Sequence, residues 1–215
     1  MTLTGSFQIE DEQGEFLVRL ARKAIIEYLK SNIKISPPPE TPGKLREKCG
    51  VFVTLNRVTA KGGRELRGCI GYPEPVMPLV KATIDSAINA AVGDPRFPPV
   101  RLGELNQIVI EVSVLTPPQL VKVESLRDYP HQIRIGVDGI IVEKGFYRGL
   151  LLPQVPVEWG WDSEEFLSHG CLKAGLPPDA WLVPGTKIYK FQAIIFEEEK
   201  PSGEVNRRTL KGCMG

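Results

Sequence analysis

The most informative segment of the sequence is Leu66-Arg67-Gly68-Cys69-Ile70-Gly71-Tyr72. A strand over 65–71 would place two glycines beside a thiol, although glycine weakens a strand. Glycine in such a place indicates a β-bulge, or a point where another backbone or a ligand approaches closely. A strand-like run at 50–56 and the turn residues Lys61-Gly62-Gly63 precede the segment. Together they predict a β-hairpin.

From the hairpin onward, the predicted elements follow the order ββαβ twice. In the first half, the hairpin is followed by a predicted helix and strand, at about 77–91 and 108–116. In the second half, the predicted elements are two strands, a helix and a strand, at 139–143, 146–152, 163–174 and 187–196. Arg148-Gly149 falls where Arg67-Gly68 falls in the first half. The sequence therefore predicts duplicated ββαβ units.

A helix precedes these units, because the apolar residues between Glu15 and Asn32 recur at helical spacing. The predicted fold class is α+β, with this N-terminal helix, mostly antiparallel sheets and two lobes. We expect one domain over 1–215, with lobes at 12–125 and 126–196. Residues 197–215 are charged and contain glycine, which predicts a loose tail.

The composition is typical of a soluble globular protein, with 42% apolar and 25% charged residues. A net charge of +1 gives no global field that would attract nucleic acid or acidic lipid. Residues 1–15 lack the basic end and apolar run of a signal peptide, and no stretch is apolar enough to span a bilayer. A cytoplasmic location is therefore expected. The four cysteines form no Cys-x-x-Cys pair, which argues against a zinc or redox motif.

Cys69 is the candidate catalytic residue. Its thiol would lie at a strand end, where Arg67 and backbone N–H groups could stabilise the thiolate or bind an anion. The alternative is that Cys69 packs as a small apolar side chain while the glycines bend the hairpin. The candidate binding residues lie in the strand and in the proline-stiffened loop 94–99, and they are Arg67, Gly68, Gly71, Arg96 and Phe97.

A cysteine nucleophile needs a base within hydrogen-bonding reach, and the chain has two histidines. His131 falls in a predicted loop, and His169 falls late in a predicted helix at a position typical of an exposed polar residue. A metal site from Cys69, His169 and Cys171 is disfavoured, because residues two apart on a helix point to different faces. No metal is predicted, and no cofactor is assigned.

Four segments resemble the hallmarks of the AMMECR family, named for the AMME syndrome critical region. They are 66–71, 94–99, 112–116, and 151–155 with Trp161-Asp162, and they occur in the family's order across nearly the whole chain. The resemblance implies a two-lobed α+β fold with segment 66–71 near a cleft, but no established reaction. It also implies an association with Memo-like or radical-SAM proteins in a modification pathway. Many relatives carry histidine where Asp138 stands, which argues against a mechanism that needs an imidazole there.

Three functional hypotheses follow. The leading one is an enzyme, or a component of one, that acts on a small molecule or modified residue in a cleft around Leu66–Gly71. The second is a non-catalytic adaptor that binds a protein partner through the same surface. The third and least favoured is nucleic-acid binding through Arg207, Arg208 and Lys211. The thiol discriminates between the first two, because an acidic Cys69 with a pKa below ~8.5 favours chemistry.

Overall fold

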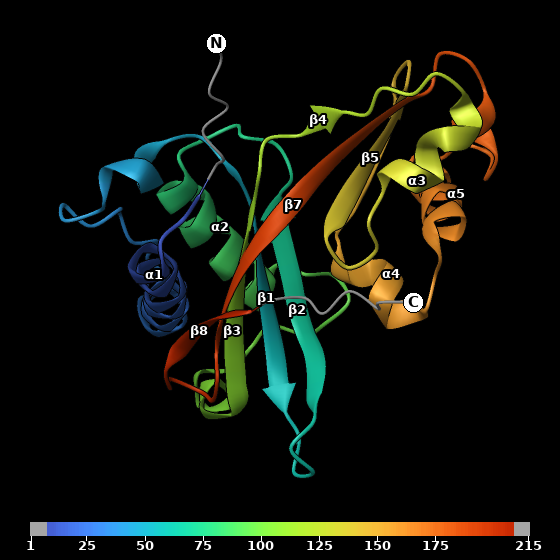
Figure 1. The fold of residues 1–215 in the computed structure, drawn as a ribbon. Coiled ribbons are helices and arrows are strands. Elements are labelled where there is room, and N and C mark those ends of the chain that lie inside the picture. The colour runs from blue at the N-terminus through green and yellow to red at the C-terminus, as the bar shows by residue number, and fades with distance from the viewer. Residues whose placement is uncertain (1–7, 209–215) are drawn as a thin grey trace. The chain divides into compact units, whose positions relative to one another are not determined.

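The computed structural model describes residues 8–208, which form an α+β fold of two compact units (Figure 1). Unit 1 comprises the described residues up to Leu115 together with Ile194–Arg208, and unit 2 comprises Thr116–Ala193. In the part of the chain that is described, no helix is long and apolar enough to cross a membrane.

Unit 1 is an antiparallel sheet with two helices on one face. Its strands are β1 (Gly50–Val58), β2 (Arg64–Tyr72), β3 (Ile108–Leu115), the end of β7 (Lys187–Glu198) and β8 (Val205–Arg208). They lie in the order β2-β1-β3-β7, with β8 paired to β7, so β2 is an edge strand. The helices are α1 (Asp11–Ser31) and α2 (Leu79–Val92), and the 3₁₀ turns are η1 (Gly43–Arg46) and η2 (Leu102–Gln107).

The strands of unit 1 alternate between the two faces of the sheet. Val51, Val53 and Leu55 of β1 are fully buried against the helices, whereas Phe52 and Thr54 between them are half-buried on the opposite face. This period of two is what a half-buried strand requires. The opposite face of the sheet therefore carries Thr54 and its cross-strand neighbour Cys69.

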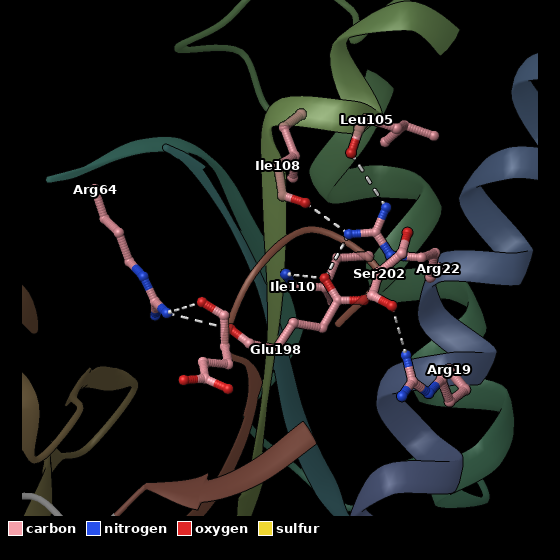
Figure 2. Close-up of polar contacts among 9 residues, drawn as sticks. Arg19, Arg22, Arg64, Leu105, Ile108, Ile110, Glu198 and Ser202 are labelled. Carbon is pink, nitrogen blue, oxygen red and sulfur yellow. Dashed lines mark hydrogen bonds and ion pairs between the residues drawn. The ribbon is translucent and has the colours of Figure 1, made fainter. Parts of the chain in front are cut away.

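A buried ion pair joins α1 to the end of β7 within unit 1 (Figure 2). The guanidinium of Arg22 donates to both carboxylate oxygens of Glu198 and to the carbonyl oxygen of Ile108, at 2.6 Å for the latter. The backbone N–H of Ile110 donates to the same carboxylate at 3.0 Å. Because both charges have several partners, the pair can remain in the core.

Unit 2 is also an antiparallel sheet with helices. Its strands are β4 (Gln119–Leu120), β5 (Asp138–Lys144), β6 (Tyr147–Leu151) and the first part of β7, in the order β4-β7-β5-β6. Its helical elements are η3 (Leu126–Asp128), α3 (Tyr129–Gln132), α4 (Gln154–Trp159), α5 (Ser163–Lys173) and η4 (Ala180–Leu182). Asp162 and Glu165 form a capping box at the start of α5.

The α+β class, the N-terminal helix and the antiparallel sheets are confirmed, but the chain divides differently from the expected lobes 12–125 and 126–196. The boundary falls after Leu115, and the chain returns to unit 1 at Ile194 because β7 is one long strand shared by both units. The expected loose tail is also wrong over 197–208, where the end of β7 and all of β8 pair in register. The rest of that tail lies outside the described residues.

Candidate functional site

The predicted β-bulge lies at Arg67. Gly68 pairs with Leu55 of β1, and Leu66 pairs with the next residue, Asn56, so Arg67 has no residue opposite it. A bulge bends its strand and re-aims a side chain. Here the re-aimed guanidinium turns to η2, where it donates to Glu104 from Nε at 3.2 Å and from Nη2 at 3.3 Å.

The close approach predicted at the glycines is made by the protein itself. A Cβ on Gly68 would overlap the carbonyl oxygen of Ala90 near the end of α2. A Cβ on Gly71 would overlap the carbonyl oxygen of Val51 and the ring of Phe52. Both glycines therefore let β2 pack closely against its neighbours, and the space beside each α-carbon is already filled.

Every polar group of Cys69 has a partner. Its N–H donates to Oδ2 of Asp94 at 2.9 Å, and its carbonyl oxygen accepts from Nη2 of Arg96 at 3.4 Å. Its sulfur accepts from the hydroxyl of Thr54, the cross-strand neighbour, at 3.3 Å. The residue is half-buried. Hydrogen bonds to Cys69 thus hold the loop that contains Asp94 and Arg96 against β2.

Asp94 organises this loop. The residue is 4% exposed, and its carboxylate accepts from Nε and Nη2 of Arg96, at 2.9 and 2.7 Å, in a bidentate pair. Arg96, followed by the N–H of Cys69, holds the pKa of Asp94 well below its usual range. The guanidinium of Arg96 also lies 5.5 Å from the ring centroid of Phe97. Of the candidate residues, the structure therefore places Arg96 against both Cys69 and Phe97.

The pKa of the Cys69 thiol is raised, which is opposite to the lowering that the enzymatic hypothesis requires. Burial is the largest cause, and the charges of Glu111 and Asp94 act in the same sense. The Thr54 hydroxyl and the Arg96 cation oppose this shift without reversing it. Arg67, which was expected to stabilise the thiolate, is paired with Glu104 instead.

Glu111 of β3 is a site residue that sequence reasoning did not select. It is 5% exposed and lies across from Thr54, which in turn lies across from Cys69, so the three residues form a row over β2, β1 and β3. Burial raises its pKa, although Arg208 donates to it at 3.0 Å. The available signal was a carboxylate inside an otherwise apolar strand.

The two described arginines of the least favoured hypothesis, nucleic-acid binding, pair with residues of unit 1. Arg208 pairs with Glu111 at 3.0 Å, and Arg207 donates to Asp11 at 2.7 Å while lying 4.9 Å from the ring centroid of Phe196. Lys211 lies outside the described residues. The two arginines therefore help to hold β8 and the start of α1, which is a structural use of their charges.

A cavity of about 560 Å³ lies beside Arg67 in unit 1. Its wall is formed by the loop before η2, by η2 and by β2, through Arg67, Pro98, Pro99, Val100, Arg101 and Glu104. Arg67 is 7% exposed, and its Nη1 has no hydrogen-bond partner among the described residues. A buried donor without a partner lowers stability by about 1–3 kcal/mol, and by more when it is charged. An acceptor bound to this nitrogen would remove that cost.

The histidines belong to unit 2. His169 stacks on Trp161 with ring centroids 3.7 Å apart, and His131 lies in α3. Cys171 is fully buried, which raises its pKa. Asp138 is also buried and accepts from Arg134 at 3.1 Å and from Gln192 at 3.4 Å. Over residues 8–208, no three His, Cys, Asp or Glu side chains are grouped as a metal site.

Comparison with known proteins agrees with the resemblance found in the sequence. The family model of AMMECR1 matches residues 18–196. Protein PH0010 of Pyrococcus horikoshii is 62% identical over 204 residues, covering 95% of this chain and 98% of the relative. Protein MK0488 of Methanopyrus kandleri is 60% identical over 200 residues, covering 93% and 95%. The crystal structure of uncharacterized protein PH0010 matches with a TM-score of 0.88 at 61% identity, covering 95% of this chain and all of that one.

Proposed function

The chain belongs to the AMMECR1 family, and we propose that it acts as a non-catalytic binding module in which the β1–β2 hairpin is a scaffold. In this proposal Cys69 holds the loop 94–99 in place instead of attacking a substrate. The adaptor hypothesis is thus favoured over the enzymatic one. An accessory role beside Memo-like or radical-SAM proteins, which the resemblance implied, is compatible with such a module.

The observation that carries the proposal is the internal bonding of Cys69. Its N–H, carbonyl oxygen and sulfur bind Asp94, Arg96 and Thr54. A nucleophilic cysteine needs a thiolate population near neutral pH, and reactive cysteines lie in electropositive, partly exposed places. Burial, the largest cause, raises the pKa of Cys69 and favours the neutral thiol, although Thr54 and Arg96 act against it. Segment 66–71 is therefore better suited to supporting a neighbouring binding surface.

The test is a pH series of iodoacetamide labelling on the folded protein, with labelled cysteines located by peptide mass spectrometry. Cys69 should label more slowly than an unstructured cysteine peptide between about pH 6 and pH 9. It should label faster than Cys49, because burial raises the pKa of Cys49 to about 12. Labelling of Cys69 faster than that of the peptide near neutral pH would contradict the proposal.

Two variants sharpen this test. Arg96→Ala removes the cation that lowers the pKa of Cys69, so labelling near neutral pH should slow further. Arg67→Met should leave the rate unchanged, because Arg67 is paired with Glu104. Slower labelling in Arg67→Met would support the enzymatic alternative, in which Arg67 stabilises the thiolate.

A further inference from the structure

We propose that the cavity beside Arg67 binds the carboxylate of a small organic monoanion whose apolar body packs on Pro98 and Pro99. This inference rests on the proposed binding function and names the class of its ligand. The site consists of the cavity wall defined above, and its recognition group is the guanidinium of Arg67.

Arg67 supplies the specific donor. Its side chain is 9% exposed, and Nε and Nη2 both donate to the carboxylate of Glu104. Nη1 is the remaining nitrogen, and it has no partner among the described residues. Glu104 occupies the Nε–Nη2 edge, and Nη1 is covered, so the guanidinium must turn slightly toward the cavity for a ligand oxygen to reach Nη1. One acceptor oxygen of a carboxylate meets that need, and its bond would be charge-assisted.

The charges of the wall favour a single negative charge on the ligand. Arg67 and Arg101 each contribute a positive charge, and Glu104 contributes a negative one. Burial disfavours the ionised form of Glu104, but hydrogen bonds from the Arg101 N–H and from Arg67 outweigh it, so its pKa is lowered and it stays charged. The wall therefore carries one net positive charge, which a monoanion balances and a phosphate dianion exceeds.

The rest of the wall favours an apolar body. Pro98, Pro99 and Val100 form one side of the cavity, and prolines present a rigid apolar surface with little conformational freedom to lose on binding. A cavity of about 560 Å³ is within the range of small-molecule sites. The loop is also fastened to β2 through Asp94, so the wall is formed before a ligand arrives.

Benzoate is the probe, and benzamide is its uncharged counterpart of the same shape. Titration followed by amide chemical shifts should show saturable benzoate binding, with shifts confined to the cavity wall. Benzamide and inorganic phosphate should each bind at least about tenfold more weakly, because a charge-assisted hydrogen bond is lost or an excess charge is desolvated. Equal binding of benzamide, or no saturable binding of benzoate, would overturn the proposal.

Matched variants test the roles of the residues. Arg67→Met should weaken benzoate binding at least about tenfold, whereas Arg148→Met at the corresponding position of unit 2 should leave it unchanged. Glu104→Gln keeps the side-chain shape but removes the competing charge, so it should tighten benzoate binding about fivefold. This variant keeps the proposal falsifiable if Arg67→Met fails to fold, since unchanged or weaker binding in Glu104→Gln would contradict it.

The failure of this inference can be distinguished from failure of the proposed function. If benzoate does not bind but Cys69 labels slowly, the non-catalytic role stands and the ligand class is wrong. If Cys69 labels faster than the free peptide, the non-catalytic role fails whatever the benzoate result.

Discussion

The hairpins of the two units share their glycine packing and differ in their arginines. In unit 1, Gly68 packs against Ala90 at the end of α2, and in unit 2, Gly149 packs against Ala174 just past the end of α5. The preceding arginine is buried in unit 1 and pairs with Glu104, whereas Arg148 is exposed and lies 4.0 Å from Glu143. The β1–β2 register has a bulge, and the β5–β6 register is regular.

This comparison separates the features of the fold from those of the site. A glycine that lets a strand approach a helix end occurs in both units, so it supports the hairpin-on-helix packing itself. The bulge, the buried guanidinium of Arg67 and the hydrogen-bonded thiol of Cys69 occur together in unit 1. We therefore expect the two ββαβ units to superpose at their glycines, with β2 on β6, and to diverge at Arg67 and Cys69.

The largest expected loss of stability comes from changing the glycine that both hairpins share. Gly68→Ala and Gly149→Ala should each lower the free energy of unfolding by about 3 kcal/mol, because the added methyl group overlaps backbone atoms that can move only with the helix. Urea unfolding of both variants measures this. A large loss for one variant and none for the other would break the equivalence of the hairpins.

Removal of the arginine before each glycine should lower stability by different amounts in the two units. Arg67→Met should lower the free energy of unfolding by about 2 kcal/mol, since it leaves the partly buried carboxylate of Glu104 without its partner. Arg148→Met should cost less than about 0.5 kcal/mol, because exposed ion pairs contribute little. Equal losses in urea unfolding would mean that the difference in burial has no energetic consequence.

A smaller loss of stability is expected when the ion pair of the loop 94–99 is removed, and this loss depends on pH. The lowered pKa of Asp94 means that its ion pair contributes stability above the unfolded pKa of ~3.9, and that this stability is lost as pH falls through the folded pKa. Asp94→Asn should therefore cost about 1–2 kcal/mol at neutral pH and progressively less below about pH 4. A loss that is constant from neutral to acid pH would contradict the assigned role of the carboxylate.

Much of the fold could be predicted from local sequence, because glycine spacing, helix caps and strand alternation act over a few residues. The bulge near Gly68 and the capping box at Asp162 are of this kind. The partners of the charged residues could not be predicted in this way. Glu104 is 37 positions from Arg67, and Glu198 is 176 from Arg22, so nothing nearby in the sequence indicates these pairs.

The contrast between local patterns and distant partners also explains why the sequence was misleading at the C-terminal tail and at Cys69. The charged run that begins at Glu197 has the composition of a solvated tail, yet Glu198 is fully buried because Arg22 and the N–H of Ile110 bind it. At Cys69, the proximity of Arg67 in sequence suggested an acidic thiol. The bulge turns that arginine to Glu104, and burial is left as the largest influence on the pKa of the thiol, which it raises.

The central claim, that Cys69 is a neutral thiol of a scaffold, is tested most directly by titrating the thiolate. The ultraviolet absorbance of the thiolate would be followed against pH in the wild-type protein and in Cys69→Ser, and the difference belongs to Cys69. We predict a midpoint above the ~8.5 of a free cysteine, because burial outweighs the Thr54 hydroxyl and the Arg96 cation. A midpoint below ~8.5 would contradict the account and return the segment 66–71 to the enzymatic hypothesis.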